Sequence, residues 1–164
     1  MSTVHIADTG FIAALGGPEN DRYRRVRAFA RQHGVVFVVP ERVYDELTAS
    51  GTEDPHVDTA IAEGWVRVAP SLNYTDSLVS RTMDSVQRYI ANADDRRADN
   101  VERADAALGG VAAQLLAAES PSSVFVYTTD IAAGEAVETA LSDAGYADSV
   151  AFVNAFEFIE DLVE

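Results

Sequence analysis

Short apolar runs rich in β-branched residues alternate along the chain with longer stretches in which apolar residues recur at helical spacing. The short runs predict strands over residues 4–7, 35–39, 65–68, 124–127 and 150–153. The longer stretches predict helices over residues 9–15, 22–32, 41–49, 55–63, 76–90, 101–119 and 131–144, with a terminal helix from about residue 155. Alternation of this kind is typical of a parallel sheet with helices on both faces. We therefore expect an α/β fold of three layers, α/β/α, around a central, mainly parallel sheet.

Acidic residues follow two of the predicted strands, at the edge where open α/β sheets place their ligand sites. Asp8 comes directly after the first strand, and Asp130 comes shortly after the fourth. Helix capping is the simpler explanation for either residue alone, because a helix begins after each position and Asp is a favoured N-cap.

Asp105 is harder to explain as a surface residue. On its predicted helix it shares a face with Leu108, Ala112 and Leu115, which we expect to pack on the sheet. An ionised carboxylate on a buried face is costly unless it is paired or binds a cation. Glu102, about one turn earlier, could join it on that face.

Glu46 lies on the helix predicted over residues 41–49, at a position that a solvated Glu could equally occupy. Asp8, Glu46, Asp105 and Asp130 nevertheless all come from ends of elements that a parallel sheet brings to one edge. Neighbouring carboxylates repel one another unless a divalent cation lies among them. Together the four acids predict a cation site.

Four short motifs occur in order, each at a defined place in the predicted fold. They are Ile-Ala-Asp-Thr-Gly-Phe-Ile (6–12), Val-Pro-Glu-Arg-Val-Tyr-Asp-Glu-Leu (39–47), Ala-Asp-Ala-Ala-Leu-Gly-Gly-Val-Ala-Ala (104–113) and Val-Tyr-Thr-Thr-Asp (126–130). With these motifs the chain resembles the PIN-domain nucleases, including toxin nucleases of the VapC type, over nearly its whole length. The resemblance implies a catalytic and metal-binding set of Asp8, Glu46, Asp105 and Asp130. It also implies supporting roles for Thr9 and Thr128, with Glu102 as a possible extra acid.

The resemblance further implies a doubly wound parallel sheet and a ribonuclease that depends on Mg²⁺ or Mn²⁺. Oxygen ligands suit Mg²⁺, which takes one or two carboxylates and keeps water and substrate phosphate around it. We expect a metal-bound water to attack an RNA phosphodiester in line. His5, His33 and His56 have no ligand spacing and are interpreted as structural. The protein would be a toxin held by an antitoxin protein or an RNA-processing enzyme, and a homodimer is possible.

The large negative net charge of the chain does not argue strongly against an RNA substrate. The chain has 27 Asp and Glu against 12 Arg and no Lys, a formal net charge of -15. A Lys-free acidic surface suits a protein kept soluble in molar salt, because at about 1 M salt the Debye length is only ~3 Å and repulsion is screened. We interpret the charge as the mark of a halophile and as weak information about the substrate.

Length and composition exclude several other classes. The 164 residues show no linker or repeat, so residues 1–164 are predicted to form a single PIN-like domain. The absence of Cys excludes disulfides and thiolate metal sites. No segment approaches the ~20 apolar residues of a membrane helix, and no leader pattern opens the chain, so we expect a cytoplasmic protein without a membrane partner.

Arginines cluster in two places, where they could contact RNA phosphates. Residues 21–33 hold five Arg against one acid, and three more Arg lie near the start of the helix that carries Asp105. From these we predict that Arg22, Arg25, Arg96 and Arg97 bind substrate, since the guanidinium fork suits phosphate. The alternative is a solvated helix face whose arginines pair with nearby acids.

A competing hypothesis predicts the same fold but little catalytic activity. The chain would then be a catalytically weak PIN-like module that binds RNA or another protein. Val79, Met83, Val86 and Ile90 form an apolar stripe that could be a dimer or antitoxin face, although core packing explains such a stripe more simply.

Overall fold

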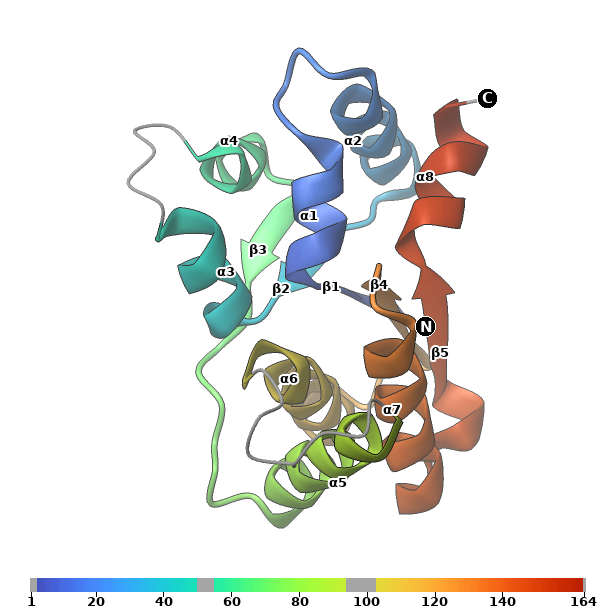
Figure 1. Ribbon diagram of the computed structural model, residues 1–164. Helices are drawn as coiled ribbons and strands as arrows, with labels where there is room; N and C mark the ends of the chain where they lie inside the picture. The colour runs from blue at the N-terminus through green and yellow to red at the C-terminus, as the bar shows by residue number, and fades with distance from the viewer. Residues whose placement is uncertain (1–2, 50–54, 94–102, 164) are drawn as a thin grey trace.

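The structure, a computed structural model, describes residues 3–49, 55–93 and 103–163 (Figure 1). Within these residues the chain forms one sheet of five strands, all parallel. The strands are β1 (Thr3–Ala7), β2 (Phe37–Val39), β3 (Val66–Val68), β4 (Ser123–Thr128) and β5 (Val150–Asn154). Their order is β3-β2-β1-β4-β5, so the winding of the sheet reverses between β1 and β4. Doubly wound sheets place ligand sites beside such a switch point, at the carboxyl ends of the strands.

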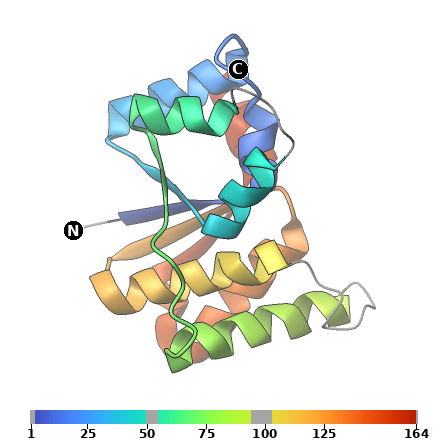
Figure 2. The same cartoon turned by 90° about the vertical axis from the view of Figure 1, so that its left-hand side faces the viewer.

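Helices cover both faces of this sheet (Figures 1 and 2). One layer contains α1 (Thr9–Leu15), α2 (Asp21–His33), α3 (Glu41–Thr48), α4 (His56–Glu63) and α8 (Ala155–Val163). The opposite layer contains α5 (Ser77–Ala93), α6 (Arg103–Glu119) and α7 (Ile131–Leu141). The predicted three-layer α/β/α architecture is confirmed.

Each face of the sheet has its own hydrophobic core, because successive side chains of a strand point to opposite faces. Val4 and Ile6 of β1 pack under α5, α6 and α7, whereas Ala7 packs with the helices of the other layer. Val79, Val86 and Ile90 of α5 are fully buried in the first of these cores. The apolar stripe on α5 is therefore a core-packing face, as the simpler interpretation predicted.

His5 is structural, as predicted, and lies among aromatic rings. Its Nδ1 is 2.9 Å from the Tyr127 hydroxyl oxygen, and its ring stacks on Phe125 with centroids 5.3 Å apart. Burial lowers the pKa of His5 below its usual value, so the neutral imidazole is favoured.

Several element boundaries differ from those predicted, and two of the differences coincide with a glycine of positive φ. The strand predicted over residues 35–39 begins only at Phe37. Val35 is not available for strand pairing because it is part of the cap that ends α2. Gly34 adopts a left-handed conformation (φ 65°), and the Val35 amide donates to the Ala30 carbonyl at 2.8 Å. The helix predicted over residues 131–144 ends at Leu141 and continues as a π turn, Ser142–Tyr146, in which Gly145 has φ 100°.

Gly109 and Gly110 let α6 approach α5 closely, and they give a matched pair of substitutions. A Cβ on Gly109 would lie 2.8 Å from a methyl of Val86, which is fully buried and β-branched. On Gly110 it would meet the flexible thioether of Met83 at 2.9 Å.

Both alanine variants gain about 1 kcal/mol of helix propensity, whereas overpacking a rigid neighbour costs about 1–3 kcal/mol. We therefore expect Gly109→Ala to lower the melting temperature by several degrees and Gly110→Ala to leave it unchanged or raise it. Thermal unfolding followed by circular dichroism measures this. Equal shifts, or the reverse order, would contradict the packing described for α5 and α6.

Candidate functional site

Asp8 and Asp130 lie at the switch point of the sheet, at the carboxyl ends of the neighbouring strands β1 and β4. The Asp8 amide donates to the Tyr127 carbonyl at 3.1 Å, which continues the pairing of these strands. Each acid caps the helix that follows it. Asp8 Oδ1 accepts from the Phe11 amide at 2.9 Å, and Asp130 Oδ1 accepts from the Ala133 amide at 3.1 Å. Capping is thus confirmed for both acids, and it fixes their carboxylates at one edge.

Thr128 connects these two acids. It is the last residue of β4 and is fully buried. Its Oγ1 accepts from the Asp130 amide at 3.0 Å and donates to Asp8 Oδ2. An ionised carboxylate can only accept hydrogen bonds, so the hydroxyl of Thr128 is the donor in its contact with Asp8. One side chain therefore holds the carboxylate of Asp8 and the backbone of Asp130 close together.

The pKa of Asp8 is raised by its place in the site. This residue is only 9% exposed, and burial is the main reason that its pKa is raised. The negative charge of Asp130 raises the pKa further, whereas the hydrogen bonds from Thr128 and the Phe11 amide lower it. A buried carboxylate beside a second carboxylate is an environment that favours a bound cation.

Glu46 reaches the same edge through α3, which follows β2. Thr9, in the first turn of α1, donates its hydroxyl proton to Glu46 Oε2 at 2.8 Å. Since Thr9 follows Asp8 directly, this hydrogen bond fixes the exposed Glu46 next to the first acid in sequence. The structure thereby brings Glu46, Thr9 and Asp8 to one side of the sheet edge.

Asp105 lies in the first turn of α6 and is half-buried. Leu108, Ala112 and Leu115 are buried, which confirms the apolar face predicted for this helix. The helix starts beside α3, at the edge where the strands end (Figure 2), and it packs on α3, β1 and β4. Asp105 therefore belongs to the same edge as the other three acids. Glu102 lies outside the described residues.

The four acids share an edge but do not form a closed ligand cage. Among all residues that the structure describes, no three His, Asp or Glu side chains are grouped so that they could hold a metal ion. The close pair is Asp8 and Asp130, linked by Thr128. This pair still fits Mg²⁺ or Mn²⁺ by its chemistry, because Mg²⁺ binds through one or two carboxylates and completes its shell with water and phosphate.

A model of the Halobacterial PIN domain family matches residues 1–164, the whole chain. The chain belongs to this family. The match confirms the resemblance found in the four motifs and agrees with the halophilic interpretation of the charge. PIN domains are generally nucleases. Comparison with curated proteins and with solved structures gave no match.

Arg22 and Arg25, two of the four arginines predicted to bind substrate, lie on α2, which carries none of the four acids. Arg22 donates to the Ala14 carbonyl at 3.4 Å, in the last turn of α1, whereas Asp8 caps the first turn. Arg25 approaches Asp21 to 3.8 Å in an exposed pair within α2. The alternative of a helix face paired with nearby acids thus describes Arg25, whereas Arg22 contacts a backbone carbonyl, and substrate binding by either residue stays a prediction. Arg96 and Arg97 lie outside the described residues.

Arg42 is a cationic neighbour of the acids that the sequence analysis did not select. It is exposed on α3, one turn before Glu46, and it takes part in none of the ion pairs that the described residues form. The signal was present in the second motif, because positions 42 and 46 are four residues apart and so share a helix face. Arg42 places a positive charge at the acidic edge of this PIN domain.

Proposed function

We propose that this PIN domain is a divalent-metal-dependent ribonuclease that hydrolyses RNA phosphodiester bonds at the carboxyl edge of its sheet. The observation that carries the proposal is the pair of carboxylates at the switch point, where Thr128 binds both the carboxylate of buried Asp8 and the backbone amide of exposed Asp130. A raised pKa at Asp8 supports it, because such a perturbed group at a ligand-binding edge is typical of functional sites.

Asp8 and Asp130 would hold Mg²⁺ or Mn²⁺, with Glu46 and Asp105 acting on the same edge. When bound, the ion would lower the pKa of a water and stabilise charge on the phosphoryl group. The chain's own residues orient the ligands. Thr128 directs its proton to Asp8 and so favours the ionised carboxylate, and Thr9 fixes Glu46 by its hydrogen bond. The caps to Phe11 and Ala133 prevent the two Asp side chains from turning away.

Metal dependence is the direct test of this function. We expect single-stranded RNA to be cleaved in molar KCl with Mg²⁺ or Mn²⁺, and cleavage to stop with excess EDTA and return when metal is restored. Asp105→Asn should lower the rate by at least about 10-fold, the usual size of effects on groups around a metal site. The matched control is Asp21→Asn, in an exposed ion pair on α2, which should not change the rate.

Persistence of cleavage in EDTA would contradict metal catalysis. Equal rates for Asp105→Asn and Asp21→Asn would contradict the proposed place of Asp105 in the site.

A second candidate function is binding with little turnover. The observation that favours it is that the described acids form no group of three that could hold a metal. Such a module would bind RNA without cleaving it under any metal condition, so the same assay separates the two functions.

RNA is the substrate that this proposal requires, whereas the expected antitoxin and homodimer stay predictions. No helix in the described ranges is both long and apolar enough to cross a membrane. Size-exclusion chromatography in molar KCl would show whether the chain forms a dimer by itself. A cytoplasmic location also stays a prediction.

A further inference from the structure

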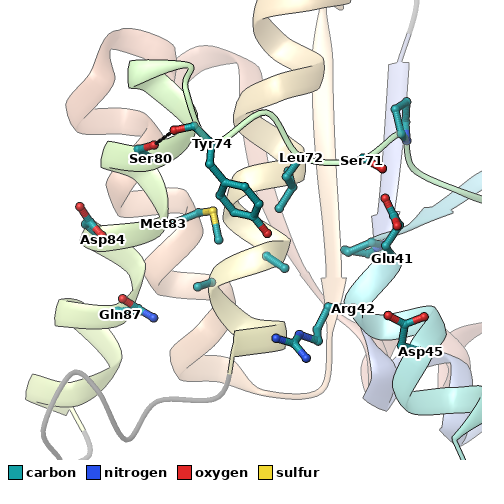
Figure 3. Close-up of a pocket in the computed structure, with 14 residues that line it drawn as sticks. Glu41, Arg42, Asp45, Ser71, Leu72, Tyr74, Ser80, Met83, Asp84 and Gln87 are labelled. Carbon is teal, nitrogen blue, oxygen red and sulfur yellow. Dashed lines mark hydrogen bonds between the residues drawn. The ribbon is translucent and has the colours of Figure 1, made fainter.

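A cavity of about 790 Å³ lies between α3, the segment 69–76, α5 and the first turns of α6 (Figure 3). Its volume is in the range of sites that bind small molecules or single molecular groups. Ala106 and Ala107, which directly follow Asp105, line one wall, and Asp45, next to Glu46, lines another. The cavity therefore adjoins the acidic edge.

Tyr74 is the main aromatic group of this cavity. Its side chain is 66% exposed, and Figure 3 shows its ring pointing into the cavity between Met83 and Leu72. Folding gains little from burying Tyr74, because about two thirds of the surface of this residue stays in contact with solvent. A large exposed ring beside an apolar wall offers a stacking surface for a flat ligand.

The backbone that carries Tyr74 is held in place. The Asn73 amide donates to Gln114 Oε1 at 2.8 Å, and Gln114 Nε2 donates to the Ser71 carbonyl at 3.0 Å. On the other side, the Ser80 hydroxyl donates to the Tyr74 carbonyl at 2.6 Å. Side chains of α5 and α6 thus fix the segment on both sides of Tyr74. The ring is presented from a rigid position, so little conformational entropy would be lost on binding.

The charges that line the cavity indicate which part of an RNA it could bind. Glu41, Asp45 and Asp84 line the cavity, whereas Arg42 is its one basic lining residue among those described. Three carboxylates against one guanidinium disfavour a phosphate inside. A nucleobase is neutral, and its N–H groups can donate to carboxylates. Arg42 lies at the end of the cavity beside the start of α6 (Figure 3), where it could meet the backbone of the same strand.

We propose that this cavity is a nucleobase subsite, in which an unpaired base of single-stranded RNA stacks on Tyr74 while Arg42 contacts the adjoining phosphate. The inference rests on the proposed ribonuclease function and adds the place where one base of the substrate binds. Only an unpaired base can leave its stack to enter the cavity. The subsite selects single strands over duplexes.

The experiment measures binding of a fluorescent single-stranded RNA in molar KCl by anisotropy, without metal, so that no cleavage occurs. Tyr74→Ala should weaken binding by about 10-fold or more, the usual effect of losing a base–aromatic stack. Tyr74→Phe keeps the ring and should bind like the native protein. Phe156→Ala is the matched control, because Phe156 is also exposed (53%) but lines no part of the cavity.

A base analogue gives a second readout. An RNA containing 2-aminopurine should lose fluorescence on binding to the native protein and to Tyr74→Phe but not to Tyr74→Ala, since stacking quenches this base. The same RNA annealed to its complement should bind at least about 10-fold more weakly than the single strand.

Three results would overturn the subsite: unchanged binding by Tyr74→Ala, an equal loss in Phe156→Ala, or equal affinity for the duplex. Binding of a partner protein at this surface, with no RNA affinity, would overturn it as well. Because binding is measured without cleavage, failure of the subsite is distinct from failure of the nuclease. A nuclease without the subsite would still cleave in the Tyr74→Ala variant at the native rate.

Discussion

Replacing Asp8 by Asn should abolish RNA cleavage and at the same time stabilise the fold. Asn keeps the cap, because its side-chain oxygen can accept from the Phe11 amide, and it remains a good N-cap residue. The variant lacks the negative charge that would hold a cation, so we expect the cleavage rate to fall by at least about 100-fold. Loss of activity without loss of structure would distinguish a functional acid from a structural one.

The gain in stability follows from the direction of the pKa shift. Burial and the charge of Asp130 raise the pKa of Asp8, so the folded protein binds a proton more tightly than the unfolded chain does. The free energy of unfolding therefore falls as pH rises from the unfolded pKa, 3.8, through the raised pKa of the folded state. Asn has no such loss.

We expect Asp8→Asn to raise the free energy of unfolding by about 1 kcal/mol at pH 7, a gain typical of relieving strain at an active site. Below pH 3.8 that advantage should disappear. Chemical unfolding at several pH values, without divalent metal, measures the difference. A variant that is less stable than the native protein at pH 7 would contradict the electrostatic description of Asp8.

Replacing Thr128 by Val should shift the pH dependence of cleavage as well as lower its rate. Val has nearly the same shape but no hydroxyl, so buried Asp8 Oδ2 loses a donor and the part-buried Asp130 amide loses an acceptor. Leaving such groups unpaired costs about 1–3 kcal/mol of stability. Because the Thr128 hydrogen bond lowers the pKa of Asp8, its removal raises that pKa further.

In the proposed mechanism cleavage requires ionised Asp8, so the acidic limb of the pH–rate profile should move to higher pH in Thr128→Val. Thr128→Ser restores the hydroxyl and should return the limb to its native position. A profile that does not move, with only a lower rate, would show that Thr128 acts through packing alone and does not position Asp8.

Most of the elements that position the candidate site could be predicted from the sequence. Strands and helices followed from periodicity, and Asp8 and Asp130 followed from their positions after strands, because caps and strand ends are local features. Their link through Thr128 is less local, since residues 8 and 128 meet only once β1 and β4 pair. The resemblance to PIN domains predicted a supporting role for Thr128. That its hydroxyl donates to Asp8 could be seen only in the structure.

What could not be predicted depends on how separate elements pack. The hydrogen bond between Thr9 and Glu46 requires α1 and α3 to lie side by side, which neither helix specifies alone. The cavity at Tyr74 depends on the path of the segment 69–76. Gln114 fixes this path, and it lies on α6, about 40 residues further along the sequence. Arg22 and Arg25 were selected from a cluster of arginines, and that cluster gave no information that Arg22 would contact the last turn of α1 and Arg25 would pair with Asp21.

The central claim is that Asp8 and Asp130 together bind one divalent cation. A crystal grown or soaked with Mn²⁺ at saturating concentration, measured for anomalous scattering at the manganese edge, tests it directly. The account predicts a single strong peak in contact with both carboxylates, at about 2.2 Å, the distance typical of manganese–oxygen bonds and close to that of magnesium. A map in which the only peaks lie away from Asp8 and Asp130 would contradict it.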